Sequence, residues 1–69
     1  MEREVIEILS EYLSPQAAAT LLARAKARLT PTTPQDWARL LEGPLWEELR
    51  AILPFREMPP GLKALVRRL

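Results

Sequence analysis

Residues 30–44, with the sequence TPTTPQDWARLLEGP, contain the signals that divide this chain into helices. Thr33 precedes a proline and stands three residues before Asp36, so its side chain can cap a helix whose first residue is Pro34. Gly43-Pro44 ends that helix and opens the next one. The segment therefore predicts a short helix from Pro34 to Gly43. Its apolar residues expected to face inward are Trp37, Leu40 and Leu41.

Two helical patterns precede this segment and meet at Ser14-Pro15. Pro15 disfavours the helical conformation at Ser14, and Ser14 can cap a helix that has Pro15 in its first position. Apolar residues recur at three- and four-residue spacing on both sides of this joint. We therefore expect a first helix over residues 2–13 and a second over residues 15–29. The apolar stripe of the first contains Val5, Ile8, Leu9 and Tyr12, and that of the second contains Ala18, Leu21, Leu22, Ala25 and Leu29.

Two further helical patterns follow, separated by a connector over residues 55–61. The first begins at Pro44 and ends at Pro54, which cannot continue a helix. The second covers residues 61–69 and has only about two turns, too few for a helix that is stable in water alone. We expect it to dock on its own domain or on a partner. The apolar face of the earlier helix contains Leu45, Leu49 and Ile52, with Trp46 and Leu53 at its margin.

The fold class predicted by these patterns is all-α, because an alternation of period two is nowhere sustained. A length of 69 residues permits one small domain, which we assign to residues 1–69. We expect a compact bundle of four to five short helices. A chain this short hides only about 60% of the surface that its unfolded form exposes. Dimerisation would complete the bundle and offset that deficit, since the chain has no Cys for disulfides.

The formal net charge is only +1, but acidic and basic residues alternate along the chain. The net charges are −3, +3, −2 and +3 for residues 1–13, 14–33, 34–53 and 54–69. Successive antiparallel helices that pair complementary edges account for this alternation, which helps the register of the helices more than their stability.

An alternative use of the basic segments is binding to nucleic-acid phosphates. The chain would then be a nucleic-acid-associated protein that uses the basic helix 15–29 and the basic C-terminal helix 61–69. Neither helix has the cluster of Asn, Gln and Arg that reads base edges, so we treat nucleic acid as an unlikely partner. The candidate phosphate contacts are Arg24, Lys26, Arg28, Lys63, Arg67 and Arg68.

Few residues of this chain could act in catalysis, because it contains neither His nor Cys. The commonest general base and the best thiol nucleophile are therefore missing, along with the usual zinc ligands. Glu4, Glu7 and Glu11 share a helix face, but that face opposes the apolar stripe, so we expect solvent-exposed carboxylates there. We accordingly expect no enzyme, no catalytic residue, no metal site and no cofactor.

The aromatic residues suggest a protein interface. Trp and Arg dominate interface hot spots, and several such residues lie close together in and after the helix that begins at Pro44. The first helix also has an apolar arc of about 160°, wider than a helix of a small monomer needs. We expect a small adaptor or regulatory subunit that self-associates as a homodimer and binds an unknown protein partner. The candidate interface residues are Tyr12, Trp46, Arg50, Phe55, Arg56 and Met58.

The sequence also suggests a location and a type of source. No segment is apolar and long enough to span a bilayer, and the acidic start differs from a secretory signal, so we expect a cytoplasmic protein. Seven Pro, no Asn and an excess of Arg over Lys favour a GC-rich, thermophilic source.

The last helix is basic on one face and apolar on the other, which leaves weak binding to an anionic membrane surface as a further alternative.

Overall fold

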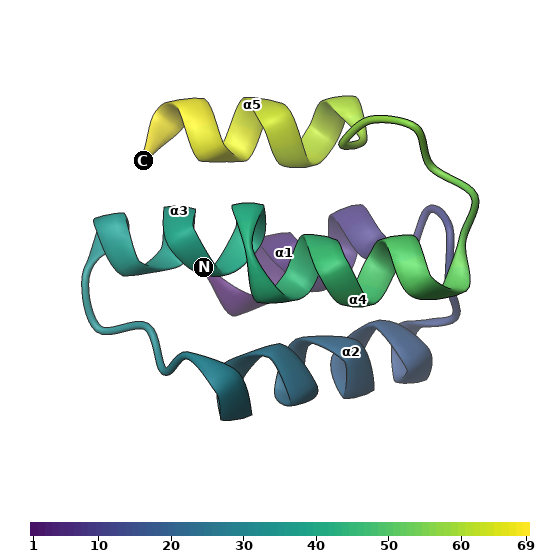
Figure 1. Cartoon of the computed structure of the whole chain (residues 1–69), viewed down its shortest axis with the longest axis horizontal. Helices are drawn as coiled ribbons and strands as arrows, with labels where there is room; N and C mark the ends of the chain where they lie inside the picture. The colour runs from purple at the N-terminus through teal and green to yellow at the C-terminus, as the bar shows by residue number, and fades with distance from the viewer.

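A computed structural model describes all residues from 1 to 69 and contains five helices and no strands. The predicted all-α bundle of short helices is confirmed. No helix has both the length and the apolar character needed to cross a membrane. The helices are α1 (Glu2–Leu9), α2 (Pro15–Arg28), α3 (Pro34–Glu42), α4 (Pro44–Ile52) and α5 (Pro60–Arg68), as drawn in Figure 1.

The helices pack as a central layer with one helix on each side of it. In Figure 1, α3 and α4 run in the same direction across the middle with α1 behind them, α5 lies above, and α2 lies below. α2 contacts α1 and α4, while α5 contacts α1 and α3. The chain reverses between α1 and α2, between α2 and α3, and between α4 and α5, so α1 and α4 run in the same direction and end on the same side of the molecule.

Side-chain caps begin α2 and α3 where the sequence predicts them. The Ser14 hydroxyl oxygen accepts a hydrogen bond from the Ala17 N–H at 3.1 Å, and the Thr33 hydroxyl oxygen accepts one from the Asp36 N–H at 3.1 Å. Each cap satisfies a backbone donor that has no partner within its helix.

The α3–α4 junction is a single residue, Gly43, where an added Cβ would lie 2.9 Å from the Arg39 carbonyl oxygen. Gly43 therefore permits a close backbone approach at this bend.

The first helix is shorter than predicted, because α1 ends at Leu9 rather than at residue 13. The Ser10 hydroxyl donates a 2.6 Å hydrogen bond to the Ile6 carbonyl oxygen. The N–H groups of Glu11 and Tyr12 then bond to carbonyls three residues earlier instead of four. This tighter turn ends the α-helix and turns Tyr12 away from the regular stripe.

The core contains only aliphatic side chains contributed by all five helices. Its twelve buried residues are Val5, Leu9, Ala18, Leu21, Leu22, Ala25, Leu40, Leu41, Leu45, Leu49, Leu62 and Leu65. Trp37, Trp46 and Phe55 are half-buried and pack on its outside. The prediction that Ile52 faces inward is wrong: its side chain is 56% exposed, because it lies at the C-terminal end of α4, beyond the packed layer.

Candidate interaction site

Three aromatic side chains form a continuous line on the surface, which we call the aromatic row: Trp46, Phe55 and Tyr12. The ring centroids of Phe55 and Tyr12 are 5.1 Å apart, with the ring planes at 89°. Those of Phe55 and Trp46 are 6.2 Å apart, with the planes at 34°. Phe55 therefore occupies the middle of the row. It meets Tyr12 edge to face, which is a preferred aromatic geometry, and it meets Trp46 at a tilt.

The fold brings these rings together from segments that are distant in the sequence. Tyr12 lies in the turn that follows α1, and Phe55 lies just after Pro54 at the end of α4. The Phe55 N–H donates to the Leu53 carbonyl oxygen at 2.9 Å, which makes a tight turn after the helix. Because α1 and α4 end on the same side of the molecule, the two turns meet there (Figure 1). Tyr12 remains 39% exposed.

Arg50 extends the row at the Trp46 end. Its guanidinium carbon lies 5.8 Å from the centroid of the Trp46 ring, within the range of a cation–π contact. Trp46 and Arg50 are four residues apart on α4 and so share one face of that helix. Arg50 is exposed and forms no ion pair with a carboxylate of its own chain.

The structure thus brings together four of the six predicted interface residues, namely Tyr12, Trp46, Arg50 and Phe55. The other two have different surroundings. Arg56 is exposed and makes no hydrogen bond or ion pair, and Met58 is half-buried against the core. Nearness in the sequence suggested both, but the connector carries them onward toward α5.

The six candidate phosphate contacts are mostly engaged within the chain. Arg24 and Arg28 of α2 pair with Glu48 and Glu47 of α4, each at 2.8 Å. Only Arg67 has no acidic partner. The remaining pairs are Lys26 with Glu2, Lys63 with Glu57 at 3.6 Å and Arg68 with Glu4 at 3.1 Å.

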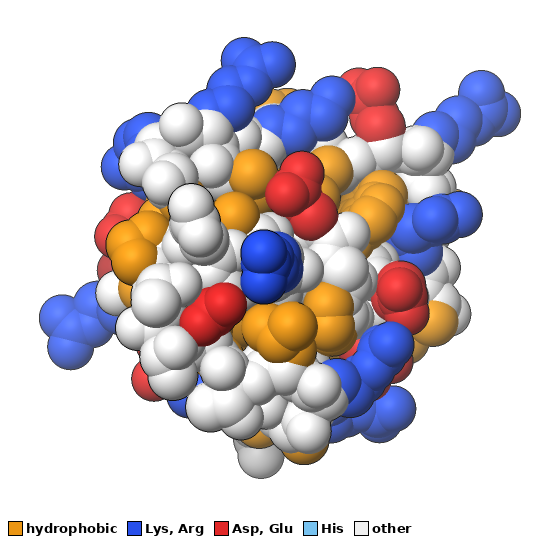
Figure 2. All heavy atoms as spheres, turned by 60° about the vertical axis from the view of Figure 1, so that its left-hand side comes forward, with side chains coloured by type: hydrophobic (Ala, Val, Ile, Leu, Met, Phe, Trp, Pro, Cys, Tyr) orange, Lys and Arg blue, Asp and Glu red, His pale blue; other side chains and the backbone are white.

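Four of the five ion pairs join segments of opposite net charge, whereas the fifth, Lys63 with Glu57, lies within the basic segment 54–69. The four connect α2 to α4, α1 to α2 and α1 to α5, so only one of these three helix pairs is successive in the chain. In Figure 2, Lys and Arg side chains project all around the face drawn, with Asp and Glu among them and with hydrophobic side chains in separate small areas. That face therefore presents no extended basic surface.

Two ionisable groups have displaced pKa values, and both are explained by hydrogen bonds. Hydrogen bonding to Glu47, followed by the charge of the same carboxylate, raises the pKa of Arg28. The Thr32 hydroxyl and N–H donate to the Asp36 carboxylate at 2.8 and 3.1 Å and lower its pKa. Asp36 and Thr33 thus form a variant of the predicted capping box, in which the carboxylate accepts from the residue before the cap.

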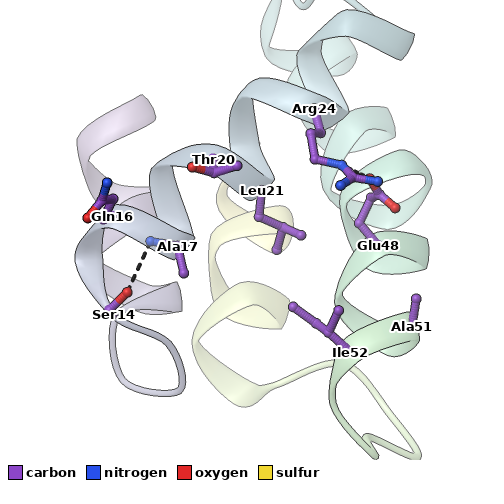
Figure 3. A pocket seen from close by; sticks show the side chains of 9 residues that line it. All are labelled: Ser14, Gln16, Ala17, Thr20, Leu21, Arg24, Glu48, Ala51 and Ile52. Atoms are coloured by element: carbon purple, nitrogen blue, oxygen red, sulfur yellow. Dashed lines mark hydrogen bonds and ion pairs between the residues drawn. The ribbon is translucent and has the colours of Figure 1, made fainter.

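The sequence did not indicate a groove that lies between the N-terminal half of α2 and the end of α4. Its volume is about 450 Å³. Figure 3 shows Leu21 and Ile52 directed into the space between the helices, with Arg24 and Glu48 meeting at one end. The remaining lining residues are small or polar: Ser14, Gln16, Ala17, Thr20 and Ala51. The helical pattern predicted Ile52 on the core face of α4, so it did not indicate that Ile52 and Leu21 together line an apolar groove.

The carboxylates of α1 do not gather into a ligand set. No group of three or more acidic side chains lies close enough to hold a metal ion. Glu4 is instead paired with Arg68, while Glu7 and Glu11 are exposed.

Comparison with known proteins gives no relative on which to base an assignment. No protein-family model matches the chain, and no curated protein or solved structure matches it significantly.

Proposed function

We propose that this chain is a small non-catalytic protein-interaction module, an adaptor or regulatory subunit, whose binding surface is the aromatic row with Arg50. The row supports this proposal because it combines the residue types that dominate interface hot spots. A Tyr, Phe or Trp anchor covered by a partner contributes about 2 kcal/mol or more when it is a hot spot. The aliphatic core leaves these rings outside, where a partner can reach Tyr12.

Self-association, a cytoplasmic location and a thermophilic source belong to the same proposal. The small size of the chain supports self-association, since a second subunit would bury surface that 69 residues leave exposed. The composition, rich in Arg and Pro, supports the thermophilic source. Fractionation of the source cells, followed by detection of the protein in the soluble fraction, tests the location.

The pairing of basic residues favours this proposal over nucleic-acid binding. Five of the six basic side chains that could contact phosphates are within 4 Å of an acidic side chain of the same chain. A phosphate would have to displace those carboxylates, which reduces the gain from counterion release.

Photochemical cross-linking in the source cells tests the proposed surface. p-Benzoylphenylalanine in place of Tyr12 puts the reactive group at the exposed end of the row. Irradiation is expected to give a covalent adduct with one predominant protein, identified by mass spectrometry. The matched control carries the same amino acid in place of Gln35, an exposed residue in the first turn of α3 at the opposite end of the molecule.

The control position is expected to give little or no adduct. Equal adducts from both positions, or none from position 12, would contradict the proposal that the aromatic row is the binding surface.

A further inference from the structure

We infer that the partner of the aromatic row is an acidic protein segment, which places an Asp or Glu carboxylate on Arg50 beside an apolar side chain that packs on the rings. The inference rests on the proposed function and names the chemistry of the partner at the same surface. A second copy that covered the row would have to meet this requirement with a carboxylate of its own.

Arg50 is placed on the row by its contact with Trp46. The guanidinium carbon lies over the Trp46 ring, 5.8 Å from the ring centroid. A partner that approaches this face of Trp46 therefore meets the guanidinium first. Arg50 is exposed, so the group is open to such a partner. The cation consequently belongs to the surface that the row presents.

The guanidinium of Arg50 has no acceptor within its own chain. A guanidinium has five N–H donors. Those of Arg50 take part in none of the side-chain hydrogen bonds and none of the ion pairs. The two carboxylates of α4, Glu47 and Glu48, are engaged elsewhere, since they pair with Arg28 and Arg24 of α2, each at 2.8 Å. The acidic residues nearest to Arg50 in the sequence therefore do not neutralise it.

A partner that covers the row would remove water from this guanidinium. Moving an ionised group out of water is costly unless the group is paired and hydrogen-bonded. Since the chain supplies no acceptor, the partner has to supply one. A carboxylate fits best, because its two oxygens match two N–H groups of a guanidinium and because hydrogen bonds between ionised groups are stronger than neutral ones.

Two further charged residues adjoin the row in the sequence, but together they favour neither sign. Glu11 precedes Tyr12 and Arg56 follows Phe55, and neither forms an ion pair. Their charges are opposite, whereas Arg50 is the cation that stacks on a ring of the row. Arg50 therefore sets the sign of the charge that the partner needs.

The rings require the apolar part of the partner segment. Tyr12 is 39% exposed, and Trp46 and Phe55 are half-buried. An aromatic or aliphatic side chain that packs on these rings would bury apolar surface that the isolated chain leaves in water. An acidic residue next to such an anchor can then reach Arg50 at the Trp46 end. The row and its cation together thus select an apolar anchor with a neighbouring carboxylate.

Peptide selection with a matched charge reversal tests this chemistry. A phage-displayed library of random peptides is selected on the immobilised wild type, on Arg50→Glu and on Arg67→Glu. Peptides selected on the wild type should combine an apolar anchor with Asp or Glu, and selection on Arg50→Glu should lose this acidic preference. Arg67→Glu is the control, because it changes the net charge equally but reverses an exposed, unpaired Arg on α5. It should select the same peptides as the wild type.

Isothermal titration calorimetry then measures the binding of a synthetic peptide from the wild-type selection. We expect Arg50→Glu to raise its dissociation constant about tenfold or more, and Arg67→Glu to change it by no more than about twofold. Arg50→Lys keeps the charge but loses the planar guanidinium, so its dissociation constant should lie between those of the wild type and Arg50→Glu. Circular dichroism verifies that each variant is helical.

Tyr12→Ala distinguishes failure of this inference from failure of the proposed function. Selected peptides that bind Tyr12→Ala much more weakly than the wild type bind at the row. If such peptides lack acidic residues, or bind Arg50→Glu as tightly as the wild type, the acidic partner is overturned and the aromatic row remains the interaction surface. If the selected peptides bind Tyr12→Ala as tightly as the wild type, or if no peptide is enriched, both the inference and the proposed surface are overturned.

Discussion

Tyr12, Phe55 and Trp46 lie outside a core that contains only aliphatic side chains. Aromatic rings are the largest apolar groups available for burial, and their placement at the rim of a small core makes them available to a partner. Arg50 adds a cation that is stacked but unpaired. At the scale of single residues, the candidate site therefore consists of large side chains that the fold buries only in part.

Asp36 gives a prediction about acid stability. Its pKa is lowered from 3.8 by hydrogen bonds from Thr32, so the folded state favours the carboxylate. Stability from this group is present above the unfolded-state pKa and is lost as the pH falls through the lower, folded-state pKa. Below about pH 4, the melting temperature of the wild type should fall more steeply than that of Asp36→Asn. Circular dichroism measures both melting temperatures at each pH. If the two melting temperatures fell equally steeply with pH, that result would contradict the role assigned to this carboxylate.

At the scale of the elements, local chemistry explains which boundaries the sequence predicts. Ser14, Thr33 and Gly43 each precede a proline, and all three mark boundaries in the structure. The end of α1 has no such signal, because it depends on the Ser10 hydroxyl bonding back to Ile6. Ile52 was misplaced for a different reason. Its spacing is that of the core face, but whether a helix covers that end of α4 depends on tertiary packing.

Two residues of α4 should differ strongly in how much their truncation to Ala lowers the free energy of unfolding. Leu49 is fully buried, whereas Ile52 is 56% exposed. Leu49→Ala should lower the free energy of unfolding by about 2–5 kcal/mol, because it removes core packing and leaves a cavity. Ile52→Ala should change it by no more than about 0.5 kcal/mol. Urea denaturation compares the two. Similar losses for both would mean that Ile52 packs inside after all.

The two glycines should also differ in how much their substitution by Ala changes the stability of the fold. A Cβ at Gly43 would meet the Arg39 backbone oxygen at 2.9 Å, whereas one at Gly61 would meet the Ile8 side chain at 3.0 Å. A half-buried side chain can move, but the α3 backbone cannot move without bending the junction. Gly43→Ala should therefore cost about 1–3 kcal/mol. Gly61→Ala should be nearly neutral, because the higher helix propensity of Ala, about 1 kcal/mol, offsets the contact.

Urea denaturation measures both effects. A Gly43→Ala variant as stable as the wild type would show that the α3–α4 junction does not need a residue without a side chain.

At the scale of the whole molecule, the arrangement of the helices decides which predicted residues form a site. The sequence suggested Trp46, Arg50, Phe55, Arg56 and Met58 because they are neighbours in the chain. Tyr12 was predicted as well, and the structure brings it beside the first three at the common end of α1 and α4, while it leaves the other two apart.

The distribution of charge over the molecule predicts weak or no binding to nucleic acid. Five of the ten basic side chains pair with carboxylates of the same chain, and both signs are mixed on the face shown in Figure 2. An electrophoretic mobility-shift assay at low salt, with duplex DNA and single-stranded RNA, should show no retarded complex at micromolar protein. A retarded complex that dissociates steeply with added salt would instead support phosphate binding by α2 and α5.

Sedimentation velocity over a concentration series tests the proposed self-association through the aromatic row most directly. The wild type should show a reversible monomer–dimer equilibrium, and Tyr12→Ala should raise the dissociation constant about tenfold or more while it retains the helical circular dichroism spectrum. Tyr12 is suited to this comparison because its side chain is exposed and its loss leaves the core intact. A wild type that sediments as a monomer at every concentration, or a Tyr12→Ala variant that dimerises as tightly as the wild type, would contradict the proposal.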